Sequence, residues 1–288
     1  MSWGSLLLIG LAGVTVVAIG LSSYGVKRWS DTTRDLLVQL ERGRTAPPVP
    51  RYLSAELVGL PPPVQRYFQT VLSDGQPIIT AVSVTHIGTF NMGEVADQWK
   101  SFTSQQRVVT RRPGFVWNGR IQMLPGVPVV VHDAYIRGEG RLHPAILGLF
   151  SLMDMRGTGD IAQGELMRFF AEAAWYPTAL LPSQGVQWTP VDDHTARAVL
   201  TDGNLQLSMT FGFDAQNLIT FVRAEARGRT VGDAIVMTPW EGRWSDYQRR
   251  DGMLVPMKGD VSWLTEQGRK TYWRGTIREI TYEFASVE

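Results

Sequence analysis

The chain has 288 residues, of which 44% are hydrophobic and 19% charged, and its formal net charge is +1 at pH 7. This length can bury a full core, and so apolar and neutral a composition excludes a disordered chain or a protein that holds nucleic acid through an overall basic field. The absence of cysteine excludes disulfides, thiolate metal sites and thiol nucleophiles.

Residues 1–29 are predicted to form a transmembrane anchor. Ser2–Val26 contains no charged residue, Leu6–Leu21 is almost wholly apolar, and Trp3 and Tyr24 flank this stretch. About 20 apolar helical residues cross the hydrocarbon of a bilayer, and Trp and Tyr favour its two interfaces. The alternative is a cleaved signal peptide, which would need a basic start and a small-residue cleavage site, and neither is evident. We therefore expect a single retained membrane helix.

Basic residues follow the predicted span and none precedes it. Under the positive-inside rule they place the large C-terminal domain on the cytoplasmic side. Large domains can also be translocated despite flanking charge, so the opposite topology stays open. The basic residues concerned are Lys27, Arg28, Arg34, Arg42 and Arg44.

A helical stretch and a proline-rich linker, residues 30–50, connect the anchor to the domain. Asp31–Glu41 carries leucines on one stripe, and it either forms its own helix or extends the membrane helix. The prolines of Gly43–Pro50 prevent a continuous helix there. The remaining residues, 51–288, are predicted to form one domain, which begins with a short helix over Pro63–Leu72.

From Ile78 onward the hydrophobic period changes to two, which indicates β-strands. In the first strand Val82, Val84, His86 and Phe90 share one face. Short turn sequences separate the strands, so we expect hairpins and a mostly antiparallel sheet. The predicted strands are Ile78–Phe90, Gln98–Thr110, Phe115–Met123, Val127–Arg137, Arg141–Met155, Ala196–Thr201, Leu205–Phe213, Leu218–Ala226, Ala234–Tyr247, Met253–Leu264 and Lys270–Phe284.

One amphipathic helix, Asp160–Tyr176, interrupts the strands, with Asp160 as its expected N-cap. A single helix beside so many antiparallel strands predicts an α+β fold. The large sheet curves into a half-barrel or open barrel, and the helix packs against one face. A long sheet must curl or close to limit its exposed edges.

Three segments resemble a signature of an uncharacterised bacterial family: Gly164–Pro182 (GELMRFFAEAAWYPTALLP), Leu60–Phe68 (LPPPVQRYF) and Trp240-Glu241-Gly242. The likeness covers nearly all of the domain, from roughly Tyr52 to Phe284. It implies membership of that family and a location in the bacterial inner membrane, but no activity, because the family has no known function. The predicted architecture also looks like the half-barrel of periplasmic lipoprotein carriers and related lipid-binding proteins.

The polar face of the Asp160–Tyr176 helix is the first candidate site. Spacings of three and four residues place Glu165, Arg168 and Glu172 together, and Trp175 follows them. Two carboxylates bridged by a guanidinium can hold a ligand head group or act as a general acid–base pair. The same residues can equally form a solvated salt-bridge stripe. The ligand interpretation gains if the helix lies inside a curled sheet.

Ten tryptophans are the compositional oddity of the chain. Trp240 and Trp244 are predicted to share a face of one strand, and Trp263 and Trp273 to approach each other across the hairpin at Glu266–Gly268. Aromatic residues fill cores, and they also line apolar ligand grooves. We therefore count these four tryptophans as candidate ligand contacts.

Mixed strand faces accompany the tryptophans. Arg223, Glu225 and Arg227 are predicted to share a face with Ile219 and Phe221. Such mixing fits a groove that holds an amphiphile, and it also fits an ordinary exposed face.

Two histidines, His86 and His132, lie among apolar residues and are predicted to point inward. Together with a carboxylate they could run acid–base chemistry or bind a metal, although separate core histidines are more common. The chain has no zinc-protease spacing, and we expect no metal or cofactor. Gly157–Ala162 (GTGDIA) matches a dinucleotide pattern without the βαβ context, so it is interpreted as a glycine-rich turn.

These observations predict a membrane-anchored, non-enzymatic protein that binds a lipid or another hydrophobic molecule near the bilayer. One alternative is an accessory subunit of a membrane protein complex. The other is a membrane-tethered enzyme that uses Glu165 or Glu172 with His86 or His132. A packed interior without a cavity would argue against a ligand inside the sheet.

Overall fold

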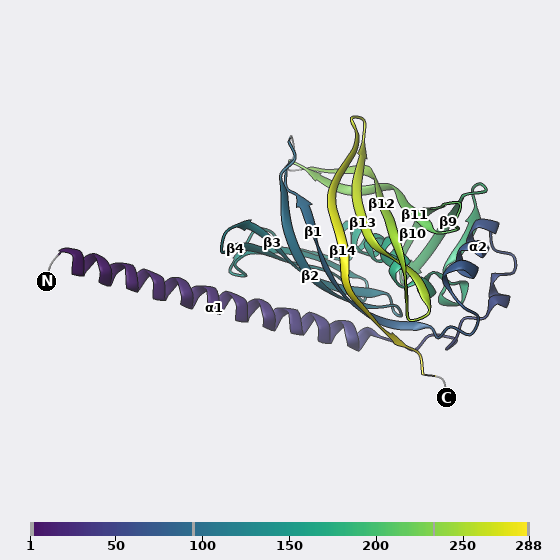
Figure 1. Cartoon of the computed structure of the whole chain (residues 1–288), viewed down its shortest axis with the longest axis horizontal. Helices are drawn as coiled ribbons and strands as arrows, with labels where there is room; N and C mark the ends of the chain where they lie inside the picture. Colours follow the sequence, from purple (N-terminus) through teal and green to yellow (C-terminus); the bar gives the residue numbers. More distant parts are fainter. Residues whose placement is uncertain (1–2, 94–95, 233, 287–288) are drawn as a thin grey trace.

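The computed structural model describes residues 3–93, 96–232 and 234–286. A strongly curved antiparallel sheet wraps around a short helix, and a long helix runs along the outside of the sheet and projects beyond it (Figure 1). The predicted α+β architecture, a large curved antiparallel sheet with one helix against it, is confirmed.

The elements follow the predicted order closely. The helices are α1 (Trp3–Gly43), α2 (Pro62–Val71) and α3 (Asp160–Ala171), with 3₁₀ turns η1 (Ser54–Leu57), η2 (Glu172–Trp175), η3 (Pro177–Leu180) and η4 (Pro182–Gln184). The strands are β1 (Ile79–Asn91), β2 (Trp99–Val109), β3 (Gly114–Leu124), β4 (Val127–Ile136), β5 (Glu139–Ile146), β6 (Phe150–Ser151), β7 (Met155–Gly157), β8 (Gln187–Pro190), β9 (Thr195–Asp202), β10 (Leu205–Phe213), β11 (Ile219–Val231), β12 (Ala234–Arg250), β13 (Met253–Thr265) and β14 (Gly268–Phe284).

The sheet consists of two antiparallel meanders that share one seam. The strand order is β6-β5-β4-β3-β2-β1-β14-β13-β12-β11-β10-β9-β8, with β7 beside β5. Pairing of β1 with β14 therefore joins the first half of the domain to the last half. Sequential hairpins build each half, as the short turn sequences predict.

Three details differ from the sequence prediction. The expected strand Arg141–Met155 breaks at Leu147, whose φ of 55° begins a left-handed turn that an extended strand cannot contain. The short edge strand β8 was not predicted. Helix α3 begins after Gly159, Asp160 caps nothing, and beyond Ala171 the chain tightens into 3₁₀ turns.

Helix α1 is continuous from Trp3 to Gly43, so Asp31–Glu41 extends the first helix. The side chains of residues 6–10, 14 and 18, which belong to the predicted anchor, lie outside the described part. Among the helices of the described residues, none combines the length and the apolar character that a membrane span requires.

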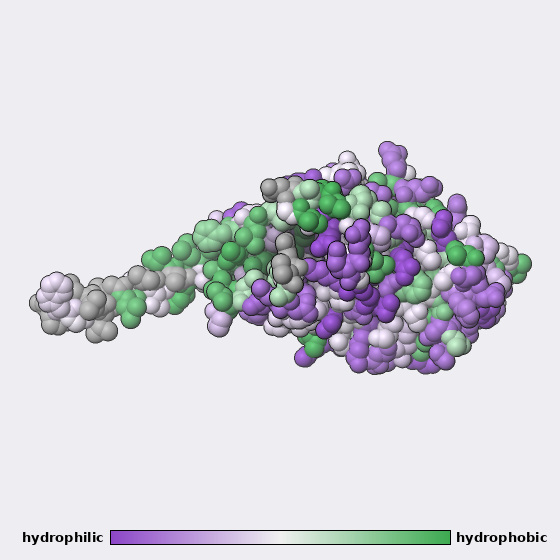
Figure 2. All heavy atoms as spheres, turned by 90° about the horizontal axis from the view of Figure 1, so that it is seen from above, coloured by the Kyte–Doolittle hydropathy of each residue, from purple (hydrophilic) through white to green (hydrophobic). Residues whose placement is uncertain are grey.

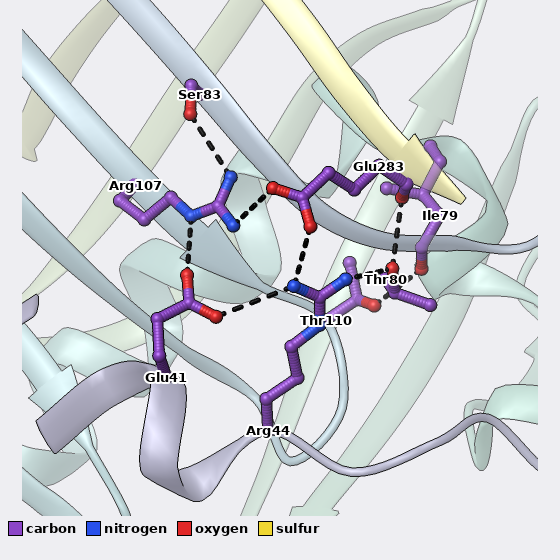
Figure 3. A network of polar contacts seen from close by, with 8 residues as sticks. All are labelled: Glu41, Arg44, Ile79, Thr80, Ser83, Arg107, Thr110 and Glu283. Atoms are coloured by element: carbon purple, nitrogen blue, oxygen red, sulfur yellow. Dashed lines mark hydrogen bonds and ion pairs between the residues drawn. The ribbon is translucent and has the colours of Figure 1, made fainter. Parts of the chain in front are cut away.

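The C-terminal half of α1 packs on the outer face of the sheet. Leu36 and Leu40 form a small core with Ala81, Val109 and Val116. The helix end is held by a network of ion pairs and hydrogen bonds that Figure 3 shows. Its charged members, with N···O distances of 2.6–2.7 Å across the helix–sheet boundary, are Glu41, Arg44, Arg107 and Glu283. Each pair is partly exposed and contributes little alone, but together they fix where α1 ends against the sheet.

The inner face of the sheet holds the main core. The predicted apolar stripe of α3 is buried: Leu166 is 0%, Phe169 3% and Phe170 1% exposed. Helix α2 adds Tyr67 and Phe68 to the same cluster. The domain therefore buries both faces of its sheet, the inner one against α3 and part of the outer one against α1.

Candidate functional site

Arg168 lies at the centre of a buried polar cluster on the inner face. Its Nε donates to Glu172 Oε1 at 2.8 Å, its Nη2 to Gln106 Oε1 at 3.3 Å, and its Nη1 to Asp133 Oδ2. Gln106 closes the cluster by donating to Glu172 Oε2 at 2.6 Å. The guanidinium also lies 4.9 Å from the ring centroid of Phe115. The cluster thus contains the predicted Arg168–Glu172 pair, but its second carboxylate is Asp133 of β4 and not Glu165.

Glu165 occupies a neighbouring position with fewer partners. It is 4% exposed, and the closest cation is Arg227, whose Nη2 lies 4.0 Å from Oε1. In the described part of the chain, neither Glu165 Oε2 nor Asp133 Oδ1 has a hydrogen-bond partner. Burial, reinforced by the charge of Asp133, raises the pKa of Glu165 well above its ordinary value of 4.5. A protonated Glu165 has a hydrogen to donate, and Asp133 is the neighbouring carboxylate that can accept it.

Glu165→Gln should make the stability of the protein less sensitive to pH. Folding raises the pKa of Glu165, so the folded state binds the proton more tightly, and wild-type stability falls as pH rises from about the unfolded value of 4.5 through the folded pKa. The neutral amide keeps the donor and removes this loss. Denaturant unfolding of both proteins from pH 4 to 8 measures how the free energy of unfolding changes with pH. The variant Glu225→Gln, at an exposed position, is the control. Parallel pH profiles for wild type and Glu165→Gln would contradict the assignment.

A β-bulge brings Arg227 to this cluster. Ala224 pairs with Trp240, but the next pair is Arg227 with Thr238, so β11 carries one extra residue. Arg223 therefore lies outside, 2.6 Å from Glu241, whereas Arg227 lies inside with its guanidinium 5.0 Å from the ring centroid of Trp240. The prediction that Arg223 and Arg227 share a face is wrong, because the bulge inverts the alternation between them.

The candidate tryptophans meet on the inner face and are closely packed. Trp175 contacts Trp244 edge-on, with ring centroids 5.0 Å apart, and the exposed fractions of Trp240, Trp244 and Trp273 are 3%, 5% and 8%. All of them belong to the main core cluster or pack directly against it. They fill a core between the helix and the sheet, which weakens the prediction that they form the wall of an open ligand cavity.

The predicted approach of Trp263 to Trp273 is wrong. Trp263 pairs with Lys270 across the hairpin, while Trp273 pairs with Val261. The ring of Trp263 stacks instead on Tyr272, with centroids 5.6 Å apart. A register irregularity between Val261 and Ser262 contributes to this offset.

The two histidines lie on opposite faces of the sheet. His86 points inward as predicted: it is 2% exposed, its Nδ1 lies 3.2 Å from Ser104 Oγ, and burial together with Arg168 lowers its pKa to about 3. His132 faces α1, where its ring stacks on Trp29 at 3.8 Å and its Nε2 lies 2.7 Å from Thr33 Oγ1. No single pocket can hold both.

His132 points outward because the outer face of the sheet is also packed, against helix α1. The apolar residues around it on β4, Val130 and Ala134, share its face and pack with α1 residues on the outside of the sheet. The alternation of β4 was correct, and only the choice of the inner face was wrong. An apolar face that binds an external helix has the same sequence pattern as one that faces a core.

The outer face also carries a hollow that the sequence analysis missed. It has a volume of about 940 Å³ and lies between α1 and strands β1, β2, β3, β4 and β14. Thr85, Thr103 and Gln105 belong to its floor, and Val26 and Trp29 to its helix side. The sequence did contain a signal for the docking of α1, because Trp29, Leu36 and Leu40 form an apolar stripe on this helix. If α1 did not pack on the sheet, the stripe would have no partner.

No metal centre emerges from the described residues: they contain no group of three or more His, Asp or Glu side chains placed to hold an ion.

Comparisons with known proteins give one family match and distant structural similarities. A family model described as a family of unknown function, DUF6920, matches residues 58–282. No curated protein matches. Among solved structures, a LolA superfamily protein from Nitrosomonas europaea aligns with a TM-score of 0.37 at 8% identity, over 78% of this chain and 93% of the other. A beta-barrel-like DUF1849 protein from Brucella abortus aligns with a TM-score of 0.23 at 8% identity, over 72% and 99%.

Proposed function

The chain belongs to DUF6920, a family of unknown function, and from this premise we propose that it is a membrane-anchored protein that binds an amphiphilic lipid or similar hydrophobic molecule beside the bilayer. One observation carries the proposal: among the α1 residues whose burial the structure describes, Gly25 is the first that is buried. Gly25 is buried against the turn at Leu147–Leu149, and the helix before it projects past the sheet (Figure 1).

The length and the lack of charge of the projecting part support the proposed anchor. Residues 3–24 are 22 residues, or about 33 Å of helix, against about 30 Å for the hydrocarbon of a bilayer. This part carries no charge, and its described apolar side chains are exposed, with Leu11 at 66%, Val16 at 69% and Ile19 at 61%. So much apolar surface needs a partner, and a bilayer supplies one.

Apolar hairpin ends accompany the projecting helix. Because adjacent strands run in opposite directions, the turns after β1, β3, β5 and β11 share one edge of the sheet. The α1 contact at Leu147 follows β5, so the helix leaves at this edge. Hydrophobic residues gather on the end of the domain beside the helix (Figure 2). The exposed large apolar residues of this edge are Met92, Leu124, Phe150, Leu152, Met153, Val231, Ile235, Val236 and Met237. They support a domain that rests against the membrane surface.

The packed interior does not favour catalysis at the predicted acid–base residues. The carboxyl of Glu165 and the ring of His86 are 4% and 2% exposed, so a dissolved substrate could not reach them. Glu172 is occupied by Arg168 and Gln106. This geometry gives no support to the alternative of a tethered enzyme with Glu–His acid–base chemistry.

Placing charged residues in the projecting part of α1 tests whether it is a membrane anchor. We expect the full chain to remain in membranes after alkaline carbonate extraction, and the double variant Val16→Lys with Val17→Lys to be released. Each lysine at the bilayer centre costs about 2.5–3.5 kcal/mol on insertion scales. The control is Val38→Lys with Gln39→Lys, on exposed positions of the docked part of α1. Release of the wild type, or equal behaviour of both variants, would overturn the proposal.

A further inference from the structure

We infer that the hollow between α1 and the outer face of the sheet is the ligand site, and that it takes one anionic amphiphile. Its acidic head group lies between Arg120 and Arg278, and its chain extends toward Val26 and the bilayer. This inference rests on the proposed function and names the class of its ligand. The volume of about 940 Å³ lies within the roughly 300–1,000 Å³ of small-molecule sites.

The floor of the hollow is a set of cross-strand rows. Arg120 pairs with Thr103, and Thr103 with Ile87, so these side chains share the outer face. The next row consists of Asn118, Gln105 and Thr85, each paired with the next. Hydroxyl and amide groups therefore surround the cations and can donate to an acidic head group. Asn118 is itself held in place, because Trp29 Nε1 donates to its Oδ1 at 2.9 Å.

Arg278 reaches this face through a second bulge. Thr85 pairs with Glu279 and His86 with Ile277, which leaves Arg278 as the extra residue of β14. An inserted residue of this kind is released from the ladder and can be directed away from the regular alternation. Arg278 lines the hollow from the β14 side and Arg120 from the β3 side. Three strand spacings separate their backbones, or about 14 Å, which leaves room for a head group between two long side chains.

The charges of the hollow favour an anion. Its lining has three arginines and no carboxylate. Arg34 is already paired with Asp31 at 3.3 Å. Within the described residues, the side chains of Arg120 and Arg278 make no ion pair and no hydrogen bond, so their charges are uncompensated. Arginine is well suited to bind a carboxylate or a phosphate through two parallel hydrogen bonds.

The part of the hollow beneath α1 is apolar and begins directly beside Arg120, whose cross-strand partner on β4 is Val130. Val26, Val130 and Leu147 line it together with Pro128. Leu147 belongs to the turn against which Gly25 packs, so this part opens where α1 leaves the domain. A ligand with its acid at the arginines thus has its chain directed toward the proposed bilayer. A small anion would use the arginines alone.

The absence of native cysteine permits a site-specific test. In the full chain with Ser30→Cys, a fluorophore sits on α1 beside the hollow. We expect nitroxide-labelled phosphatidylglycerol to quench it at concentrations at least tenfold lower than phosphatidylcholine with the same chains. A fluorophore at Gln39→Cys, which does not line the hollow, should show no preference.

Adding Arg120→Gln and Arg278→Gln should abolish the preference at Ser30→Cys. Arg197→Gln with Arg249→Gln removes the same charge from exposed positions elsewhere and should leave the preference intact. Equal quenching by the two lipids, or an unchanged preference without Arg120 and Arg278, would overturn the inference. Displacement by glycerophosphate as effective as by phosphatidylglycerol would reveal a small-anion site and overturn it as well. Each of these results leaves the carbonate test of the anchor unaffected, so the two proposals fail separately.

Discussion

Replacing Arg168 by methionine should lower the free energy of unfolding by about 3–5 kcal/mol, because removing one partner of a buried ion pair leaves uncompensated charge. The side chains of Glu172 and Asp133 are only 10% and 14% exposed. Without Arg168, which binds both carboxylates, Glu172 and Asp133 would lose their shared cation in the core. Denaturant unfolding of the full chain in detergent, followed by tryptophan fluorescence, measures the loss.

A matched control for Arg168→Met is Arg34→Met. The side chains of the Arg34–Asp31 pair are 71% and 50% exposed, so its loss should change stability by no more than about 0.5 kcal/mol. Adding Glu172→Gln and Asp133→Asn to Arg168→Met should restore part of the loss, because the unpaired charges are then gone. If Arg168→Met costs less than about 1 kcal/mol, the cluster does not hold the interior together.

Gly25→Leu should detach α1 from the edge of the sheet. A Cβ at this position would overlap the carbonyl oxygen of Leu147 and lie 2.8 Å from Leu149 Cγ. Overpacking of this kind typically costs about 1–3 kcal/mol, so tryptic cleavage at Lys27 and Arg28 should accelerate by about 5- to 150-fold. The measurement is limited proteolysis of the full chain in detergent.

Gly20→Leu is the control for this variant, because nothing lies within 4 Å of a Cβ added there. Its cleavage rate should match that of the wild type. Gly25→Leu should also weaken the lipid preference, since α1 forms one wall of the hollow. Equal cleavage of both variants would show that the helix does not depend on its contact with the Leu147 turn.

Local patterns predicted most of the fold because strands and helices have periods that the sequence carries directly. The period of two located nearly every strand, and the stripe of Leu166, Phe169 and Phe170 located α3 and its buried face. The resemblance to an uncharacterised family is confirmed by the match over residues 58–282. Its bacterial origin and the membrane topology stay predictions.

What the patterns could not predict depends on single residues and on distant contacts. The bulges at Arg227 and Arg278 each insert one residue, which reverses a face without changing composition or period. The partners of Arg168 could be predicted only along its own helix, so Glu172 was found and Asp133 was not. His132 was assigned to the wrong face because the docking of α1 on the sheet brings together segments about 100 residues apart.

The depth of α1 in a bilayer tests the account most directly. Single nitroxides placed along residues 3–40 of the full chain in liposomes report contact with dissolved oxygen and with a water-soluble nickel complex. We predict that contact with oxygen is greatest near Gly13, halfway along the projecting segment, and that nickel gains access from Tyr24 onward. Access of nickel to every position from 3 to 24 would contradict a membrane-anchored protein.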